Sequence, residues 1–392
     1  MMDRLEMPAD DKILKLSIMF NGDDRPGKID LGIGVYRNAR GETPIFAAVR
    51  QAEEKLFAQE TTKTYVTPAG DPGFCAAIQS LVFGDDAPDE RIRTVQTPGG
   101  AGALNILAEL ANLASPGVTV HVPIPTWINH HAVITEARLG LREYRYLDPR
   151  TGQVDFDGMM DQLGNAEPGD IVLLQGCCHN PTGADLGLEQ WQAVAALLEA
   201  RGLLPFVDLA YQGFGDGLEE DAASVRLLAG RLPEMIVAYS CSKNFGIYRE
   251  RTGAAFVLAP TPALADRAAA QLARLARITY SMPPDHGASL VRIILNDPAL
   301  RQIWKDELEA MRTGVTALRR ELASAFHQIT NRSGHEFLTD QKGMFSLIGI
   351  SADQAVRLRE EFAIYIVEDG RINIAGLRGD QVMPFAKAIC AV

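Results

Sequence analysis

Four short runs of consecutive apolar residues divide the middle of the chain. They begin near Val118, Ile171, Leu203 and Met235 and read VTVHVPI, IVLLQG, LLPFVDLA and MIVAYS. Continuous apolar runs of this length are typical of strands that are buried on both faces of a sheet. Between them lie segments whose apolar residues are three and four positions apart. One of these, LEQWQAVAALLEARG from Leu188, ends in a glycine, the usual helix C-cap. The alternation predicts an α/β region.

The pattern changes after about Pro298. A long, charged and amphipathic segment, LRQIWKDELEAMRTGVTALRRELASAF, is followed by the apolar runs GMFSLIGI, IYIV and RINIAGL. We interpret the last two runs as a strand pair. Helix followed by short strands predicts a second, smaller α+β domain.

Length and charge exclude several classes of protein. A chain of 392 residues is long enough for two domains. Its net charge of -12 argues against a nucleic-acid partner, because such proteins neutralise phosphates with clustered basic residues. The N-terminus does not resemble a signal peptide, and no apolar run is long enough to span a membrane. Five cysteines at irregular spacing favour reduced thiols and a cytoplasmic protein, and we predict no metal site.

One lysine stands directly after the last apolar run of the α/β region. Lys243 lies in the segment YSCSKNFGIYRERTG, with Ser240 and Ser242 before it and Arg251 after it. An isolated loop lysine is ordinarily a solvated surface group. Here, partial burial and nearby cationic groups would lower the pKa of the amine toward the free base that attacks an aldehyde and forms a Schiff base. The two hydroxyls and the guanidinium suit a phosphate dianion.

Polar residues also follow two of the other apolar runs. Asp208 ends LLPFVD, Tyr211 comes three residues later, and Asn180 lies in CCHNPTG after IVLLQG. An acid at the end of a strand is often only a helix cap, but this one would suit a protonated pyridine nitrogen. Tyr211 could donate a hydrogen bond to a phenolic oxygen on the same ring. Since ligands of α/β sheets sit beyond the carboxyl ends of strands, these residues form one candidate site.

A glycine-rich stretch, TPGGAG, precedes the predicted helix ALNILAELANLA and includes Gly100 and Ala101. Amides at a helix N-terminus can hold a phosphate, although most glycine-rich turns serve packing. The stretch lacks the Lys-Ser/Thr ending of a P-loop. Trp127 follows another apolar run, and its ring could stack on a flat cofactor, although most tryptophans are core residues.

Taken in order, these segments resemble the fold-type I, class I aminotransferases, and in particular the aspartate and aromatic amino-acid aminotransferase family. The resemblance extends from KIDLGIGVY at residues 28–36 through TKTY at 62–65, the glycine-rich stretch and Trp127. It continues through HNPTG, DLAYQGF and SCSKNFGIYRERTG to RINIAG at residues 371–376. It therefore covers nearly the whole chain.

The resemblance implies a fold and a division into domains. We expect a large domain of residues 36–310, built on a mostly parallel seven-stranded sheet, that binds pyridoxal 5′-phosphate (PLP). We expect a smaller α+β domain formed by residues 1–35 together with residues 311–392.

The resemblance also assigns roles in cofactor binding. Lys243 is similar to the lysine that forms the Schiff base and moves the proton at the substrate α-carbon. Asp208 resembles the partner of the pyridine nitrogen, Asn180 and Tyr211 bind the ring oxygen, and Trp127 stacks on the ring. Further residues match the phosphate cradle: Gly100, Ala101, Ser240, Ser242 and Arg251. Ala101 stands where many relatives have threonine, so one hydroxyl contact to the phosphate is missing.

Other matching positions concern the substrate and a second subunit. Arg371, assisted by the backbone around Gly34, matches the clamp for the α-carboxylate, and Trp127 and Asn180 also border the substrate. Arg277 aligns with the arginine that binds the distal carboxylate of a dicarboxylic substrate from the partner subunit. Tyr65 matches a tyrosine that reaches the neighbouring subunit's phosphate, which implies a homodimer with shared sites.

The expected function is ping-pong amino transfer between an aromatic amino acid or aspartate and 2-oxoglutarate. Apolar Met282, where relatives vary, favours the aromatic branch. The alternative is a dedicated aspartate aminotransferase. A PLP lyase is disfavoured because two carboxylate clamps, Arg277 and Arg371, suit a donor and an acceptor that alternate in one site. A non-catalytic PLP-binding regulator is disfavoured by the acidity of the chain and by the early start of the aminotransferase pattern. We expect small-molecule amino acids and 2-oxo acids as partners, and neither nucleic acid nor membrane.

Overall fold

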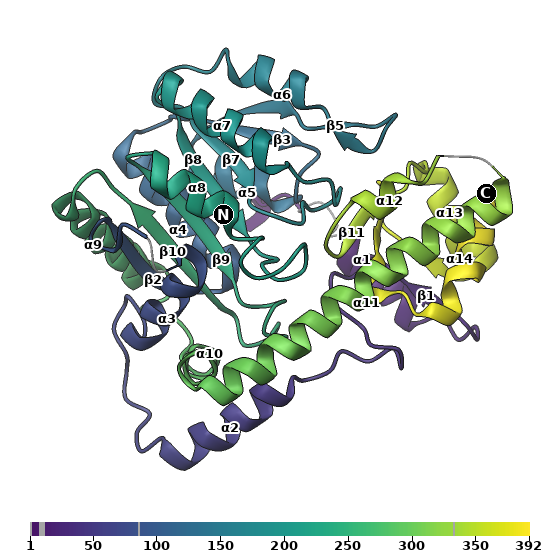
Figure 1. Cartoon of the computed structure of the whole chain (residues 1–392), viewed down its shortest axis with the longest axis horizontal. Helices are drawn as coiled ribbons and strands as arrows, with labels where there is room; N and C mark the ends of the chain where they lie inside the picture. The colour runs from purple at the N-terminus through teal and green to yellow at the C-terminus, as the bar shows by residue number, and fades with distance from the viewer. Residues whose placement is uncertain (1, 8–11, 85–86, 332–333) are drawn as a thin grey trace.

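In the computed structural model, a seven-stranded sheet forms the centre of the larger part of the molecule (Figure 1). The structure describes residues 2–7, 12–84, 87–331 and 334–392. Strand β10 of the sheet runs antiparallel to both of its neighbours, and the remaining strands of the sheet pair in parallel. The strands lie in the order β2 (Ile92–Pro98), β10 (Thr252–Leu258), β9 (Met235–Ser240), β8 (Leu204–Leu209), β7 (Ile171–Gln175), β3 (Thr119–Ile124) and β4 (Gly140–Arg145). The four apolar runs are β3, β7, β8 and β9, so the predictions of buried strands and of a mostly parallel seven-stranded α/β sheet are confirmed.

Helices cover both faces of this sheet because its central strands alternate their side chains between two cores. Leu173 and Phe206 belong to one core, and the next residues along each strand, Leu174 and Val207, belong to the other. The first core is closed by α4 (Gly99–Ala114), α5 (Asn129–Glu136) and α9 (Pro262–Thr279). The second is closed by α3 (Pro72–Phe83), α6 (Phe156–Leu163), α7 (Leu188–Arg201), α8 (Ala223–Arg231) and α10 (His286–Asn296).

Helix α7 follows the prediction closely. It starts at Leu188, and Gly202 at its end has a φ of 63°, in the left-handed region that favours glycine.

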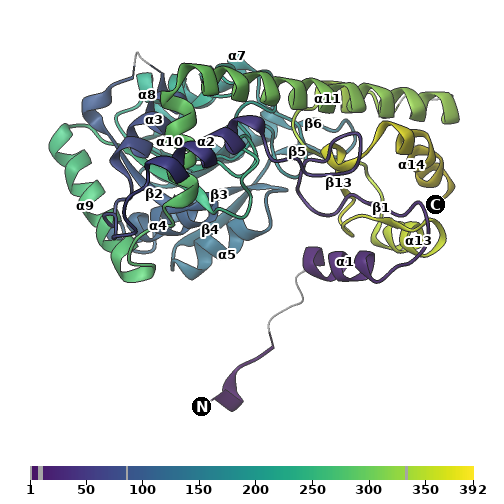
Figure 2. The same cartoon turned by 90° about the horizontal axis from the view of Figure 1, so that it is seen from below.

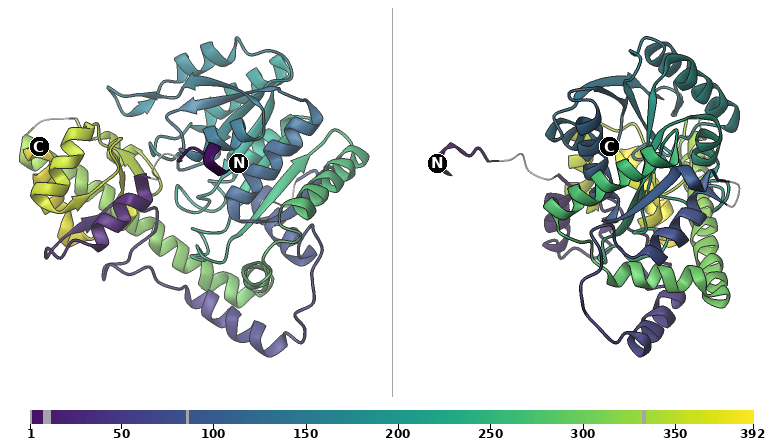
Figure 3. Two further views of the ribbon diagram at one scale, coloured as in Figure 1. Left: turned by 180° about the vertical axis from the view of Figure 1, so that it is seen from behind. Right: turned by 90° about the vertical axis from the view of Figure 1, so that its left-hand side faces the viewer.

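A smaller unit combines the two ends of the chain, and Figure 3 shows α1 (Lys12–Asn21) beside the C-terminal elements. Strand β1 (Ile29–Asp30) pairs in parallel with β12 (Ile364–Tyr365), and β11 (Phe345–Leu347) pairs antiparallel with β13 (Arg371–Asn373). The interpretation of IYIV and RINIAGL as a strand pair is therefore wrong, because β12 pairs with the N-terminal segment instead. The smaller unit also contains three helices: α12 (Phe337–Asp340), α13 (Ala352–Phe362) and α14 (Gly379–Ala391). The larger part also contains α2 (Ala47–Gln59) and a hairpin formed by β5 (Leu147–Asp148) and β6 (Gln153–Val154).

One helix, α11 (Pro298–Thr330), runs from the larger part into the smaller unit, and Figure 2 shows it along one side of the molecule. Helix α11 continues without interruption through residues 310 and 311, where we expected the domain boundary. A continuous helix marks no boundary between two domains, so the proposed boundaries stay a prediction. Within the described residues, no helix is both long and apolar enough to cross a membrane.

Helix α11 is fixed to the end of the sheet by a buried tryptophan. Trp304 is fully buried, and its ring stacks on Phe245 at 4.5 Å between centroids with planes 5° apart. Its indole Nε1 donates a hydrogen bond to the carbonyl oxygen of Asn244 at 2.6 Å. Both contacts fall on the two residues that directly follow Lys243, so the helix positions that turn.

We predict that Trp304→Phe destabilises the protein because it leaves the buried carbonyl of Asn244 without its donor. The expected loss is about 1–3 kcal/mol beyond that of a matched control, Trp191→Phe in α7, which removes the same atoms from another buried site. Urea unfolding of both variants measures the difference. Equal losses in the two variants would show that the hydrogen bond contributes nothing.

Candidate active site

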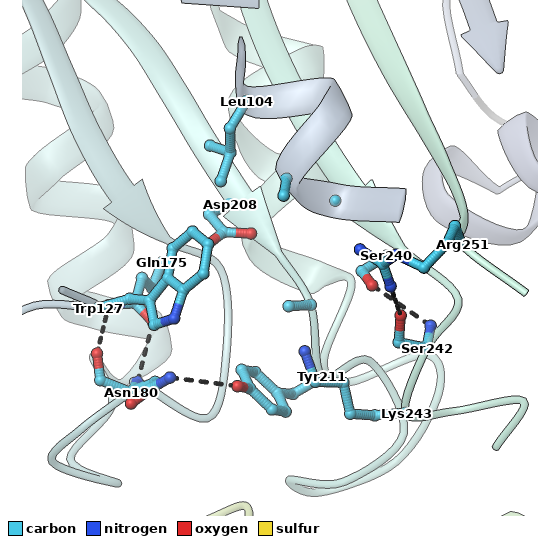
Figure 4. Close-up of a pocket in the computed structure, with 13 residues that line it drawn as sticks. Leu104, Trp127, Gln175, Asn180, Asp208, Tyr211, Ser240, Ser242, Lys243 and Arg251 are labelled. Carbon is cyan, nitrogen blue, oxygen red and sulfur yellow. Dashed lines mark hydrogen bonds between the residues drawn. The ribbon is translucent and has the colours of Figure 1, made fainter. Parts of the chain in front are cut away.

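The carboxyl ends of β7, β8 and β9 meet the start of α4 at one pocket (Figure 4). The strand register contributes to this, since Gln175 at the end of β7 lies opposite Asp208 of β8. The pocket contains every residue predicted to bind the cofactor except Tyr65. It is lined by Gly100, Ala101, Leu104, Trp127, Gln175, Asn180, Asp208, Ala210, Tyr211, Ser240, Ser242, Lys243 and Arg251.

The side chain of Lys243 is half-buried in the turn that follows β9. The pKa of its amine is lowered from 10.5 to about 8, because desolvation outweighs the carboxylate of Asp208, which raises the pKa, and the positive charge of Arg251 acts in the same direction as desolvation. The Nζ atom lies 4.7 Å from the centre of the Tyr211 ring. The lysine is therefore close to the free-base form that a nucleophile or general base requires.

A chain of hydrogen bonds supports the carboxylate of Asp208. His130, from α5, places Nε2 at 3.0 Å from Asp208 Oδ2, and Thr126 Oγ1 lies 2.8 Å from His130 Nδ1. Gln175 Nε2 donates to Thr126 Oγ1 at 3.3 Å and to the carbonyl of Asn180 at 2.9 Å. The carboxylate and the Asn180 loop are thus held by one network, which fixes their relative positions.

Sequence reasoning missed part of this network and of the lining. Gln175 carried a signal, because it is the one polar residue that ends the run IVLLQ. Thr126 and His130 carried none, since they act through Asp208 and Gln175 rather than on a ligand. Leu104 and Ala210 line the pocket as ordinary apolar residues.

Tyr211 is held as a neutral phenol at the side of the pocket. Burial raises the pKa of its hydroxyl, with a further contribution from the negative charge of Asp208. Asn180 Nδ2 donates to Tyr211 Oη at 3.3 Å, so the hydroxyl proton stays available for an acceptor in the pocket. The pair can bind one negatively charged oxygen.

The opposite end of the pocket is a cradle for an anion. The N-terminus of α4 meets the buried Ser240 and Ser242, and Arg251 Nη1 donates to Ser242 Oγ at 3.5 Å. Close approach requires glycine here, because a Cβ on Gly100 would lie 2.9 Å from Ser240 Cβ. A dianionic phosphate suits these donors.

The complete donor set fits PLP. The cradle would take the phosphate, Asp208 the protonated ring nitrogen, and Tyr211 with Asn180 the ring oxygen. The indole of Trp127, set edge-on to His130 at 82°, would cover the ring face. Lys243 supplies the amine for the aldehyde carbon.

Arg371 lies next to this pocket without lining it. It is buried, its Nη2 donates to the carbonyl of Gly32 at 2.7 Å, and its guanidinium lies 4.7 Å above the ring of Phe345. Phe345 in turn contacts Tyr211 edge-on, with centroids 6.1 Å apart. Among the described residues, Nε of Arg371 is buried without a hydrogen-bond partner, which leaves a donor for an incoming acceptor. Gly34 is required beside it, because a Cβ there would lie 2.9 Å from Phe345 Cζ.

Two predicted residues lie outside the pocket of their own chain. Tyr65 is 91% exposed, and Arg277, in the last turn of α9, donates through Nη1 to Ser281 Oγ at 2.7 Å. Met282 follows in the same segment and is half-buried. The structure of one chain therefore does not bring these side chains to the lysine.

A half-buried lysine with a pKa near 8, a strand-end acid and an anion cradle at the carboxyl edge of an α/β sheet define a PLP-dependent transferase site. The pattern of the family described as "Aminotransferase class I and II" matches residues 26–389. The chain is 49% identical to an aromatic-amino-acid aminotransferase of Paracoccus denitrificans and 44% identical to an aspartate aminotransferase of Escherichia coli, each over 100% of both chains. The solved structure of an aromatic-amino-acid aminotransferase from Burkholderia pseudomallei, covalently bound to pyridoxal phosphate, matches with a TM-score of 0.97 at 41% identity, covering 100% of this chain and 99% of that one.

The chain belongs to the class I and II aminotransferases, and it is an enzyme of this family. The family assignment made from the sequence segments is confirmed.

We predict that the apoprotein captures PLP covalently with a pH midpoint near 8. Only the neutral amine attacks the aldehyde, and the pKa of Lys243 is lowered to about 8 from 10.5. The rate constant at limiting PLP, followed by the absorbance of the bound cofactor between pH 6 and pH 10.5, gives the midpoint. Borohydride trapping and peptide mapping check the site of attachment, and Lys243→Ala should trap none. A midpoint above pH 10 would contradict the role of burial.

Proposed function

We propose that this enzyme transfers the amino group of an aromatic amino acid or aspartate to 2-oxoglutarate by a PLP-dependent ping-pong reaction. One observation carries the proposal: the amine of Lys243, with a lowered pKa, lies in one pocket with an anion cradle and the carboxylate of Asp208. The names of the relatives, which act on aromatic amino acids and on aspartate, support the two donor classes.

The geometry supports the following roles for the residues. PLP, when bound, supplies an electron sink that makes the substrate α-carbon acidic. Asp208, held by His130, keeps a proton on the ring nitrogen. Lys243 Nζ, as a free amine, would accept the proton of the substrate α-carbon and act as the general acid and base of the reaction. Tyr211 would donate its hydroxyl proton to the ring oxygen, and the centre of its ring lies 4.7 Å from Lys243 Nζ.

Two arginines serve the carboxylates of the substrates. Arg371 has a buried, unsatisfied Nε and a rigid support from Phe345 and Gly32, which suits bidentate binding of the α-carboxylate. Arg277 would bind the distal carboxylate of aspartate or 2-oxoglutarate. For an aromatic donor this cation has to leave the side-chain pocket or lie beside the ring, and the adjacent apolar Met282 favours such a ring.

We further propose that the enzyme is a homodimer that shares its sites. Tyr65 and Arg277 are then residues that each chain contributes to the partner subunit's pocket. Phe57 in α2 is 90% exposed, Tyr65 is 91% exposed, and Ile278 beside Arg277 is 68% exposed, and the exposure of these large apolar side chains supports a protein partner. We place the enzyme in the cytoplasm, because each of the five cysteines is described and unpaired.

A dedicated aspartate aminotransferase is the second candidate, supported by the 44% identity to such an enzyme. The test adds phenylalanine or aspartate to the PLP-loaded protein, then 2-oxoglutarate, and records the cofactor absorbance and the keto acids formed. We expect both donors to convert the cofactor and 2-oxoglutarate to restore it. A response to aspartate alone would establish the second candidate, and no response to either donor would overturn amino transfer.

We predict that two arginine variants separate the two clamps. Arg371→Leu should lower kcat/KM about 100-fold or more for both donors, because each presents an α-carboxylate and loses a charge-assisted pair. Arg277→Leu should lower kcat/KM by about the same factor for aspartate and by less than about 10-fold for phenylalanine. Steady-state kinetics measure both. If Arg277→Leu affects the two donors equally, this residue does not recognise the distal carboxylate.

A further inference from the structure

Two adjacent cysteines and an aspartate meet beside the loop that carries Asn180. Cys177 and Cys178 come after β7 and Gly176, and Asp221 lies just before α8. All three are buried, and one ligand atom from each lies within 4.8 Å of the other two. Sequence spacing cannot reveal this cluster, because the aspartate comes from a different loop. The reaction described above uses none of the three.

The separation of these atoms suits a small tetrahedral cation. An ion bound at about 2.3 Å from sulfur and about 2.0 Å from oxygen would hold such ligand atoms roughly 3.5–3.8 Å apart. Movements of about 1 Å or less bring the cluster to that spacing. Thiolates combined with a carboxylate are ligands that soft d10 cations of the Zn²⁺ type prefer over Mg²⁺ or Ca²⁺.

The backbone fixes the carboxylate of Asp221 in advance. Its Oδ2 accepts hydrogen bonds from the amides of Gly213 and Gly215, both at 2.8 Å, and its Oδ1 accepts from Asp216 N at 2.9 Å. A carboxylate accepts about four hydrogen bonds, so one position remains for a cation. Such second-shell donors are what orients a ligand at metal sites. The carboxylate of Asp221 is therefore already ordered before an ion binds, and binding costs no further entropy for ordering it.

The cluster is reached from a cavity of about 270 Å³, which Cys177 and Asp221 line. The cavity also presents Asp185, Asp216 and Glu220, and the lysine in its lining, Lys342, is paired with Asp216. A surplus of carboxylates raises the local concentration of cations. On the side of the cluster that faces this cavity, the fourth coordination position is left to water, as in zinc sites with three protein ligands.

We propose that Cys177 Sγ, Cys178 Sγ and one oxygen of Asp221 form a binding site for a thiophilic divalent cation of the Zn²⁺ class. Both thiols lose their protons when the ion binds, so two protons are released per ion. The bound ion joins the loop of Asn180 to the loop between Tyr211 and Asp221. Both loops carry residues of the PLP pocket, so the ion stabilises the folded holoenzyme.

The test uses Cd²⁺ as a spectroscopic probe and Zn²⁺ as the stabilising ion on the holoenzyme without amino acids. Titration with Cd²⁺ should produce thiolate-to-metal charge-transfer absorbance that saturates at one equivalent, and Zn²⁺ should raise Tm by mass action. Between pH 7 and pH 8.5 the affinity should increase about 100-fold per pH unit, because two thiol protons are displaced. A dependence of about 10-fold per unit would overturn the two-thiolate site.

Cys177→Ser and Cys178→Ser should each abolish the one-equivalent absorbance and the rise in Tm. The matched control carries Cys75→Ser and Cys390→Ser, a half-buried and an exposed cysteine outside the cluster, and should retain both effects. The bound-PLP absorbance and circular dichroism of the metal-free variants check that they fold, and Cys177→Ala provides a second variant that lacks the hydroxyl. Charge-transfer absorbance that survives Cys177→Ser, or that disappears in the control, would overturn the proposal.

Discussion

The structure depends on holding a lysine amine where it loses its proton more readily than it does in water. Lys243 lies half-buried in the turn after β9, and desolvation, more than any neighbouring charge, brings its pKa to about 8. Neighbouring side chains hold this turn, because Phe245 stacks on Trp304 and Tyr239 is fully buried. The reactivity of the lysine is therefore a property of the packing of α11 against the sheet, and not of the lysine alone.

Much of the fold and of the pocket could be predicted because the signals are local. A buried strand followed by a polar residue is visible in the sequence at Asp208, at Asn180 and at Lys243, and parallel strands bring such ends to one edge. The pairing of β1 with β12 could not be predicted from periodicity, because two-residue strands have no pattern. The roles of Thr126, His130 and Asp221 could not be predicted for another reason, because their contacts are made by segments that only the tertiary structure brings together.

The positions of Tyr65 and Arg277 show a different limit. Both stand outside the pocket of their own chain, one at 91% exposure and the other paired with Ser281. Residue spacing within one chain contains no information about a contact between two copies. Only resemblance to a family could assign them a role, whereas Lys243, Asp208 and Arg251 can be argued from their chemistry alone.

The continuity of α11 determines how the two units can move. An unbroken helix of 33 residues is stiff, and α11 has no break between Trp304 near its start and the buried Arg319 in its second half. If the C-terminal unit is displaced, α11 must either bend gently or pivot about its first turns. Such a pivot would lie next to the turn of Lys243, so a displacement of the C-terminal unit would produce only a small displacement beside the reacting amine.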